Sequence, residues 1–215
     1  VEDPVEYQLD GINQVQVNAA IGLTYAAGLR SILREDPDII MVGEIRDEEM
    51  AEIAVRSALT GHLVLSTLHT NDAPSSIDRL VDMGIPPYLL ASTLRGIVAQ
   101  RLVRRICPDC KEAYEPHPEE LELLSQFGLS ATRLWRGRGC PFCNQTGYRG
   151  RLALHEVMPI QRELRRFILE RKPIESYRKW GMAHGFESML ADGLRKVLAG
   201  KTTVSEVMKV VLVED

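Results

Sequence analysis

The chain has 215 residues, of which 45% are hydrophobic, so it can bury one large or two small cores. Its net charge of −4 is unevenly spread, because residues 1–50 hold eleven acids against three arginines and residues 95–151 hold ten Lys and Arg against six acids. The acidic segment disfavours a nucleic-acid partner, and the basic one is more typical of a solvated face or a subunit contact. No apolar run approaches the roughly 18 residues of a membrane span. We therefore expect a soluble globular protein and, since Val1 is neither an initiating Met nor part of a signal peptide, a piece of a longer one.

The first six residues hold three acids, Glu2, Asp3 and Glu6, around Pro4. Pro4 cannot lie inside a helix and favours an extended Asp3. Acids so close together either coordinate a ligand or are simply solvated. The segment alone favours the second interpretation.

A helix is predicted from Thr24, a good N-cap residue, to about Arg34, before Asp36-Pro37 ends it. Arg30 and Arg34 are four residues apart, so we expect them on one helix face. Two guanidinium groups on one face suit a phosphate or an acidic neighbour. The alternative is a solvated pair, but the helix leads directly into the next motif, and we favour a functional role.

That motif is the run of residues 38–47, in which four apolar residues precede Gly43 and Glu44. The run predicts a strand buried on both faces, as at the centre of a parallel sheet. Ligands of open α/β sheets bind at the carboxyl ends of the strands, where Glu44 lies. An acid in this position is also the Walker B arrangement of P-loop NTPases.

A helix over residues 47–60 and a strand over residues 62–69 complete a predicted β-α-β unit. Both strands would then end at the same rim of the sheet, which brings His69 beside Glu44. His69 could hydrogen-bond a γ-phosphate there, and the alternative is a structural role. His62 lies at the opposite end of its strand. Beyond it, residues 73–105 read as helical, residues 152–158 as a strand, and the remainder as short amphipathic helices.

All four cysteines fall into two C-x-x-C pairs, Cys107 with Cys110 and Cys140 with Cys143. Each pair can present two thiolates from one tight turn, and four thiolates suit a closed, structural Zn²⁺ site. A redox motif is the alternative, but redox C-x-x-C motifs occur singly beside a thioredoxin-like pattern that this sequence lacks. The pairs predict a structural metal in a reducing compartment.

Taken together, these motifs resemble the secretion ATPases that drive type II secretion and type IV pilus assembly. Residues 2–6 resemble the Asp box of that family, residues 38–47 its Walker B segment and residues 61–71 its His box. Residues 29–34 resemble its paired arginines. The two C-x-x-C pairs resemble the zinc module of extrusion-type members, which the pilus retraction motors lack. The resemblance covers nearly the whole chain.

The resemblance implies a role for each candidate residue. Glu44 would orient or deprotonate the attacking water, and Glu6, with Glu2 and Asp3, would act through Mg²⁺ or as an assisting base. The remaining residues would contact or sense the phosphates of ATP: Arg30, Arg34, His69 and His62. The cofactors implied are ATP, Mg²⁺ and a structural Zn²⁺ held by Cys107, Cys110, Cys140 and Cys143.

For the fold, the resemblance implies an α/β protein with part of a RecA-like P-loop NTPase core and a mostly parallel sheet. Residues 1–105 would belong to this core, residues 106–151 to an inserted zinc module and residues 152–215 to a C-terminal helical subdomain. The whole protein would be a cytoplasmic homohexamer at the inner membrane of a bacterium. Its partners would be an inner-membrane platform protein and the cytoplasmic domain of a membrane-anchored secretion or pilus component, with no specific nucleic acid.

One departure from the family pattern bears on activity. No G-x-x-x-x-G-K-[ST] sequence, the Walker A loop that cradles the phosphates, occurs in these residues. We therefore expect the whole protein to be an ATPase and these 215 residues alone to be inactive. Two other functions remain open, a non-catalytic zinc-containing docking module and a zinc-ribbon nucleic-acid binder.

Overall fold

The computed structural model describes residues 1–211, which form two compact units. The first unit contains residues 1–97 and 159–178, and the second contains residues 98–158 and 179 onward. These units interleave along the chain, so the three-part division at residues 105 and 151 stays a prediction. None of the helices described is long and apolar enough to cross a membrane.

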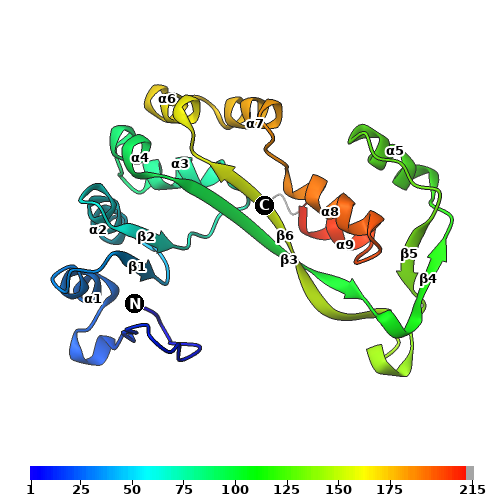
Figure 1. The fold of residues 1–215 in the computed structure, drawn as a ribbon, viewed down its shortest axis with the longest axis horizontal. Helices are drawn as coiled ribbons and strands as arrows, with labels where there is room; N and C mark the ends of the chain where they lie inside the picture. The colour runs from blue at the N-terminus through cyan, green and yellow to red at the C-terminus, as the bar shows by residue number, and fades with distance from the viewer. Residues whose placement is uncertain (212–215) are drawn as a thin grey trace. The chain divides into compact units, whose positions relative to one another are not determined.

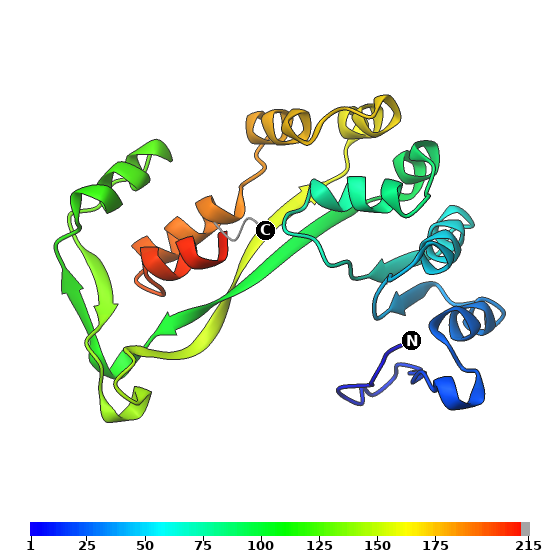
Figure 2. The ribbon, with the colours of Figure 1, turned by 180° about the vertical axis from the view of Figure 1, so that it is seen from behind.

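The first unit is built on a parallel strand pair. Strand β1 (Ile39–Val42) pairs with β2 (Leu63–Ser66), with Ile39 opposite Leu63, and helix α2 (Glu48–Leu59) connects them. Helix α2 begins where the Asp47 carboxylate accepts a hydrogen bond from the Met50 N–H at 2.9 Å. Its small residues Ala51 and Ala54 are buried. Both ribbon views show α2 beside the two strands (Figures 1 and 2), so the predicted β-α-β unit is confirmed.

The expectation that the first strand is buried on both faces was wrong. Ile40 and Val42 are buried, but the side chains that alternate with them, Ile39 and Met41, are 62% and 53% exposed. On β2, Leu63 and Leu65 are also exposed. The run of apolar residues correctly indicated a strand, but only one face of the pair is covered by residues that the structure describes.

The remaining helices complete this unit, and all of them except a short 3₁₀ turn, which has no buried residue, contribute to its core. They are η1 (Ala19–Ile21), α1 (Tyr25–Ile32), α3 (Ser75–Asp82), α4 (Pro87–Thr93), α6 (Arg162–Glu170) and the first part of α7 (Ile174–Ala183). Helix α1 begins as predicted, since the Thr24 hydroxyl accepts a hydrogen bond from the Ala27 N–H. Helix α4 packs against α2 and α6, and the Tyr177 ring meets Phe167 edge to face at 5.7 Å.

A long strand pair organises the second unit. Strand β3 (Gly96–Ile106) pairs with β6 (Tyr148–Pro159), and α8 (Met189–Leu198) packs against α9 (Val204–Val211). The helical prediction for residues 73–105 was therefore wrong over residues 96–105. The sequence there carries apolar residues at both strand and helix spacings, and pairing with β6, about 50 residues later in the chain, settles the conformation in favour of a strand.

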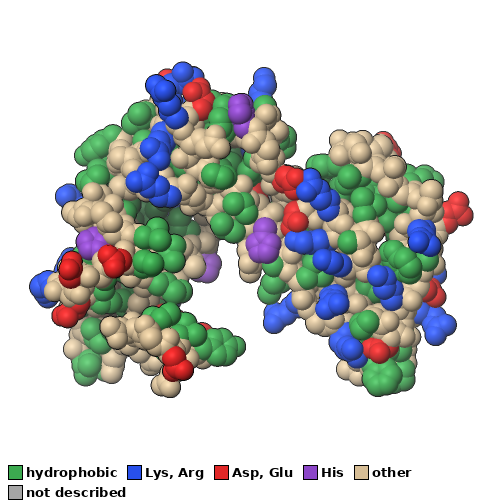
Figure 3. All heavy atoms as spheres, in the orientation of Figure 1, with side chains coloured by type: hydrophobic (Ala, Val, Ile, Leu, Met, Phe, Trp, Pro, Cys, Tyr) green, Lys and Arg blue, Asp and Glu red, His purple; other side chains and the backbone are tan. Residues whose placement is uncertain are grey.

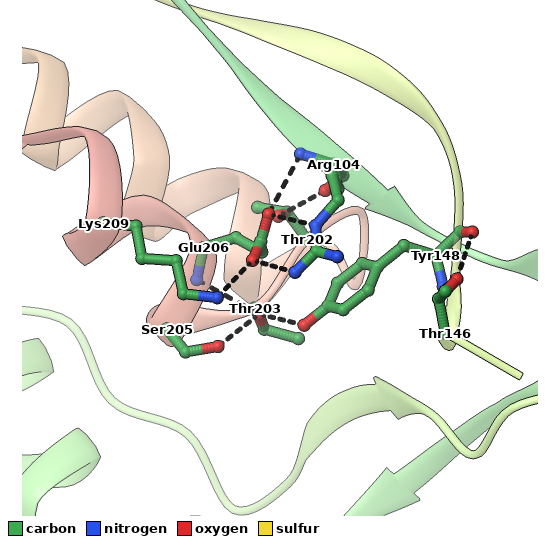
Figure 4. Close-up of polar contacts among 8 residues, drawn as sticks. All are labelled: Arg104, Thr146, Tyr148, Thr202, Thr203, Ser205, Glu206 and Lys209. Atoms are coloured by element: carbon green, nitrogen blue, oxygen red, sulfur yellow. Dashed lines mark hydrogen bonds and ion pairs between the residues drawn. The ribbon is translucent and has the colours of Figure 1, made fainter.

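Polar contacts attach the start of α9 to these strands (Figure 4). Glu206, buried on α9, is bonded to Arg104 of β3 and to Lys209 one turn further along the helix. The Tyr148 hydroxyl of β6 lies 2.9 Å from the Thr203 hydroxyl. These contacts join the start of α9 to both strands of the pair.

The cysteine module also belongs to the second unit. Strands β4 (Lys111–Tyr114) and β5 (Leu134–Gly137) pair in antiparallel register, and α5 (Pro118–Gln126) lies between them in sequence. Two short 3₁₀ turns, η2 (Pro108–Cys110) and η3 (Pro141–Cys143), carry the cysteines.

Candidate active site and metal centre

The candidate active site begins where β1 ends. Gly43 donates its N–H to the Val1 carbonyl at 2.8 Å, and its own carbonyl accepts a hydrogen bond from the Thr67 hydroxyl at 2.6 Å. The Ile45 N–H in turn reaches the Thr67 carbonyl at 3.0 Å. Glu44 is thus held between two anchored neighbours, alongside the end of β2.

Two basic side chains contact the Glu44 carboxylate. Arg46 donates to Oε1 at 2.5 Å, and His69 Nε2 lies 3.4 Å from Oε2. The Glu44 side chain is 17% exposed, whereas that of His69 is 91% exposed. The structure therefore brings Glu44 and His69 together at one rim, as the β-α-β connection predicts, and it leaves His69 open to a ligand.

Arg46 controls the charge of this carboxylate. Its hydrogen bond is the largest of the effects that lower the pKa of Glu44, and burial opposes it. His69 contributes in the same direction through its own contact. Glu44 is consequently a stable anion, suited to hold a water molecule or a cation rather than to retain a proton.

Tyr25, at the start of α1, also belongs to the site. The Arg46 guanidinium lies 5.9 Å from its ring, and a Cβ placed on Gly43 would come within 3.1 Å of its hydroxyl. Burial raises the pKa of Tyr25, and so do the nearby charges of Asp3 and Glu44. The Asp-box carboxylate of Asp3 therefore acts on the same small region as Glu44.

Sequence reasoning missed both Arg46 and Tyr25. Arg46 follows Glu44 by two residues, the spacing that places side chains on one side of an extended chain, and this could have indicated the pair. No comparable signal marked Tyr25, which lies far from Glu44 in sequence.

The other Asp-box acids are placed differently. The Glu2 backbone bonds to Val15 and Val17, and its carboxylate accepts a hydrogen bond from Gln14 Nε2 at 2.9 Å. Glu6 is exposed to solvent. The structure therefore places Glu2 in the segment beside β1, and it gives Glu6 no contact that would assign it a partner among the described residues.

The paired arginines do not share a helix face. Helix α1 ends at Ile32, and the Arg34 N–H bonds to the Ser31 carbonyl three residues back, so the chain has already turned. Arg30 forms an exposed ion pair with Glu49 at 2.6 Å. The prediction of a common face was wrong because the helix is about half a turn shorter than expected.

His62 lies at the start of β2, opposite the end that leads to His69. Its Nδ1 is 2.9 Å from the Ser57 carbonyl at the close of α2 and 3.2 Å from the Thr60 hydroxyl. The structure does not bring His62 together with Glu44.

The segment that follows His69, residues 70–72, contacts a residue of α7. Asp72 accepts the Ser75 N–H at 2.8 Å, which supports the start of α3, and it forms an ion pair with Arg178. Helix α7 is thereby attached to the segment that carries His69. Sequence reasoning missed this pair, whose members lie 106 positions apart.

The four cysteines form the candidate metal centre. Their Sγ atoms all lie within 4.8 Å of one another, and three of the four side chains are buried. The Sγ atoms of Cys107 and Cys140 are 3.9 Å apart, as are those of Cys110 and Cys143. Sulfurs placed tetrahedrally at about 2.3 Å from one centre are about 3.8 Å apart, so this arrangement fits Zn²⁺.

Backbone donors add to this fit. The N–H groups of Cys140 and Gly147 each lie 3.2 Å from the Cys143 sulfur. Burial raises the pKa of Cys143, but these donors and the neighbouring thiols outweigh it and lower the pKa to about 6. Burial raises the pKa of Cys110 to about 12. Without a metal, the cluster therefore favours one deprotonated cysteine. A bound cation is needed to stabilise all four cysteines as thiolates.

Comparisons with known proteins agree with these motifs. The family model described as "Type II/IV secretion system protein" matches residues 1–209. The type II secretion system protein HxcR of Pseudomonas aeruginosa is 51% identical over 210 residues, covering 98% of this chain and 41% of that protein. The type II secretion system ATPase E of Vibrio cholerae is 50% identical over 98% of this chain and 42% of its own length.

A pilus assembly protein and a solved structure are also similar. The type IV pilus assembly ATPase PilB of Thermus thermophilus is 49% identical over 97% of this chain and 24% of that protein. The crystal structure of the pilus retraction motor PilT with bound ADP superposes with a TM-score of 0.69 at 30% identity, over 97% of this chain and 50% of that one. The chain thus spans less than half of the curated relatives named here. It belongs to the family of type II/IV secretion system proteins.

Proposed function

We propose that the protein containing this chain is an ATP-hydrolysing motor subunit of type II secretion or type IV pilus assembly. The observation that carries the proposal is the position of Glu44 at the end of β1, where Arg46 and His69 hold its carboxylate. The names of the relatives support the same activity, since they include a secretion ATPase and a pilus assembly ATPase.

In this proposal Glu44 accepts a hydrogen bond from the attacking water and orients it toward the γ-phosphate. Arg46 keeps the carboxylate ionised and fixes its direction. His69, exposed beside it, donates a hydrogen bond to the phosphate and reports its presence. Glu2, Asp3 and Glu6 act through Mg²⁺, which when bound would neutralise charge on the phosphates.

Arg30 and Arg34 are assigned to a phosphate bound at a neighbouring subunit. Both are exposed, and among the residues that the structure describes the Arg30 side chain pairs with Glu49 alone, in an exposed ion pair that is worth little in water and can be exchanged for a phosphate. This assignment requires a ring, and we propose a homohexamer that acts on a membrane platform protein from the cytoplasmic face.

We also infer that the cysteine cluster holds a structural Zn²⁺ ion. All four ligands are sulfurs, which leaves no open position for chemistry and suits a role in folding.

Steady-state ATP hydrolysis by a longer form that carries the Walker A loop tests the proposal. Glu44→Gln keeps the shape of the side chain and removes its charge, and we expect turnover to fall at least a hundredfold. Glu52→Gln is the matched control, because Glu52 is exposed on α2 and, within residues 1–211, its carboxylate pairs with Arg56 alone. Equal activity of the two variants would contradict the proposal and favour a non-catalytic docking module.

A further inference from the structure

A basic pocket lies in the second unit, and none of the four cysteines lines it. It measures about 250 Å³ and is lined by Arg105, Arg151, Leu152 and Lys201. Arg105 lies on β3, Arg151 and Leu152 lie on β6, and Lys201 follows α8. Three of the four lining residues are therefore cations that come from three separate segments.

The backbone holds these segments together. The Ile106 N–H donates to the Lys201 carbonyl at 2.9 Å, and the Thr202 hydroxyl donates to the Arg104 carbonyl at 2.8 Å. These two bonds flank Arg105 on β3 and hold Lys201 and Thr202 beside it. The two cations are thus placed side by side by main-chain geometry and not by flexible side chains alone.

Gly200 fixes the turn that carries Lys201. Its φ is +64°, and a Cβ at this position would come within 2.6 Å of the Trp135 ring and 2.5 Å of Lys111 Nζ. Only glycine fits without displacing these neighbours. The ammonium group of Lys111 therefore also lies close to the turn that carries Lys201.

The charges of the pocket are not neutralised within residues 1–211. The neighbouring cations have partners, since Arg104 pairs with Glu206 and Arg149 with Asp109. The structure gives Arg105, Arg151 and Lys201 no ion pair among the residues it describes. Figure 3 shows Lys and Arg side chains gathered on the unit that holds these residues. Like charges placed together repel one another, so an anion would stabilise this arrangement.

We propose that the pocket binds a phosphate group. Two guanidinium groups can each offer a pair of N–H donors to phosphate oxygens, and Lys201 adds a compact positive charge. Leu152 supplies the one apolar contact, which suits the ester side of a phosphate. The same chemistry is offered by a free phosphate compound and by the headgroup of an anionic phospholipid, and the experiment distinguishes these sources. The site is separate from Glu44 and does not rest on ATP hydrolysis.

The test uses the full-length protein with a saturating non-hydrolysable ATP analogue, so that a nucleotide site is already filled. Binding of inorganic pyrophosphate is measured by calorimetry. Binding to vesicles is measured by co-sedimentation with phosphatidylcholine alone and with added phosphatidylglycerol. The pocket variant carries three substitutions: Arg105→Gln, Arg151→Gln and Lys201→Gln. The control variant makes the same change in net charge at exposed cations that do not line the pocket: Arg138→Gln, Arg162→Gln and Lys179→Gln.

We expect the pocket variant to bind at least tenfold more weakly than the native protein and the control variant to bind within twofold of it. If the pocket variant loses only pyrophosphate binding, the ligand is a free phosphate compound. If it loses only binding to phosphatidylglycerol vesicles, the ligand is a phospholipid headgroup. Equal loss in both variants would show general electrostatic attraction and overturn the proposal. Absence of binding of both pyrophosphate and phosphatidylglycerol vesicles in the native protein would also overturn it.

Discussion

The Arg104 side chain is bonded to Glu206 at two points although 102 positions separate the two residues. Nε donates to Oε2 at 2.8 Å and Nη2 to Oε1 at 2.6 Å, and the guanidinium also lies 4.2 Å from the Tyr148 ring. The Glu206 side chain is only 7% exposed, while that of Arg104 is 47% exposed. Because a nearly buried carboxylate is fully paired here, the contact fixes α9 on β3 more firmly than a surface ion pair could.

Glu206→Gln should therefore loosen α9. The neutral amide can accept only one of the Arg104 bonds and presents an N–H₂ group where another donor already lies, so we expect α9 to lose about 2 kcal/mol of local stability. Hydrogen exchange of the amides of α9 should be about 30-fold faster. Glu112→Gln, which removes an exposed ion pair with Arg136, is the control and should change exchange by less than about twofold.

The same contact predicts a dependence on pH. The pairing with Arg104 lowers the pKa of Glu206 to about 2, below its usual value of 4.5. A lowered pKa contributes stability that is present above pH 4.5 and is lost as the pH falls toward 2. Thermal unfolding between pH 6 and 2 should show the native protein losing its advantage over Glu206→Gln across this range. A constant difference between them would show that the charge of Glu206 does not carry the effect.

The sequence predicted the parts of the fold that depend on local pattern. The cap at Thr24, the helix after Asp47 and the two parallel strands followed from periodicity and short motifs, and they were confirmed. The meeting of Glu44 with His69 followed from the handedness of the connection. These features need no knowledge of contacts between distant segments.

The features that sequence reasoning missed depend on distant contacts. Residues 96–105 form a strand because β6 pairs with them, and the position of Asp72 depends on Arg178. The exposed face of Ile39 and Met41 could not be predicted, because an apolar run does not reveal which face other residues cover. Arg34 was misplaced by the ordinary uncertainty of a helix end.

Arg46 should set the acid limit of ATP hydrolysis if Glu44 acts as proposed. Arg46→Ala removes the largest of the effects that lower the pKa of Glu44, so this pKa should rise. Glu44 acts as an anion, and the acid limb of the rate profile should therefore move to higher pH. The measurement is kcat against pH for the native protein, Arg46→Ala and the control Arg56→Ala, which removes the exposed pair with Glu52. An unchanged acid limb in Arg46→Ala, with lower activity at every pH, would show that Arg46 acts in some other way.

The cysteine cluster predicts about one zinc ion per chain, measurable by elemental analysis of the purified protein. Cys143→Ser replaces a sulfur that is bonded by two backbone N–H groups with a poorer ligand, and zinc content should fall to background. Fluorescence of Trp135 on β5 should change with it, since β4 and β5 adjoin the cysteine turns. Asp109→Asn is the control, because Asp109 contacts the Cys107 sulfur at 3.6 Å and pairs with Arg149 without being one of the four ligands. That variant should keep its zinc, and loss of metal from both variants would mean that the module is held by its polar contacts as much as by its thiolates.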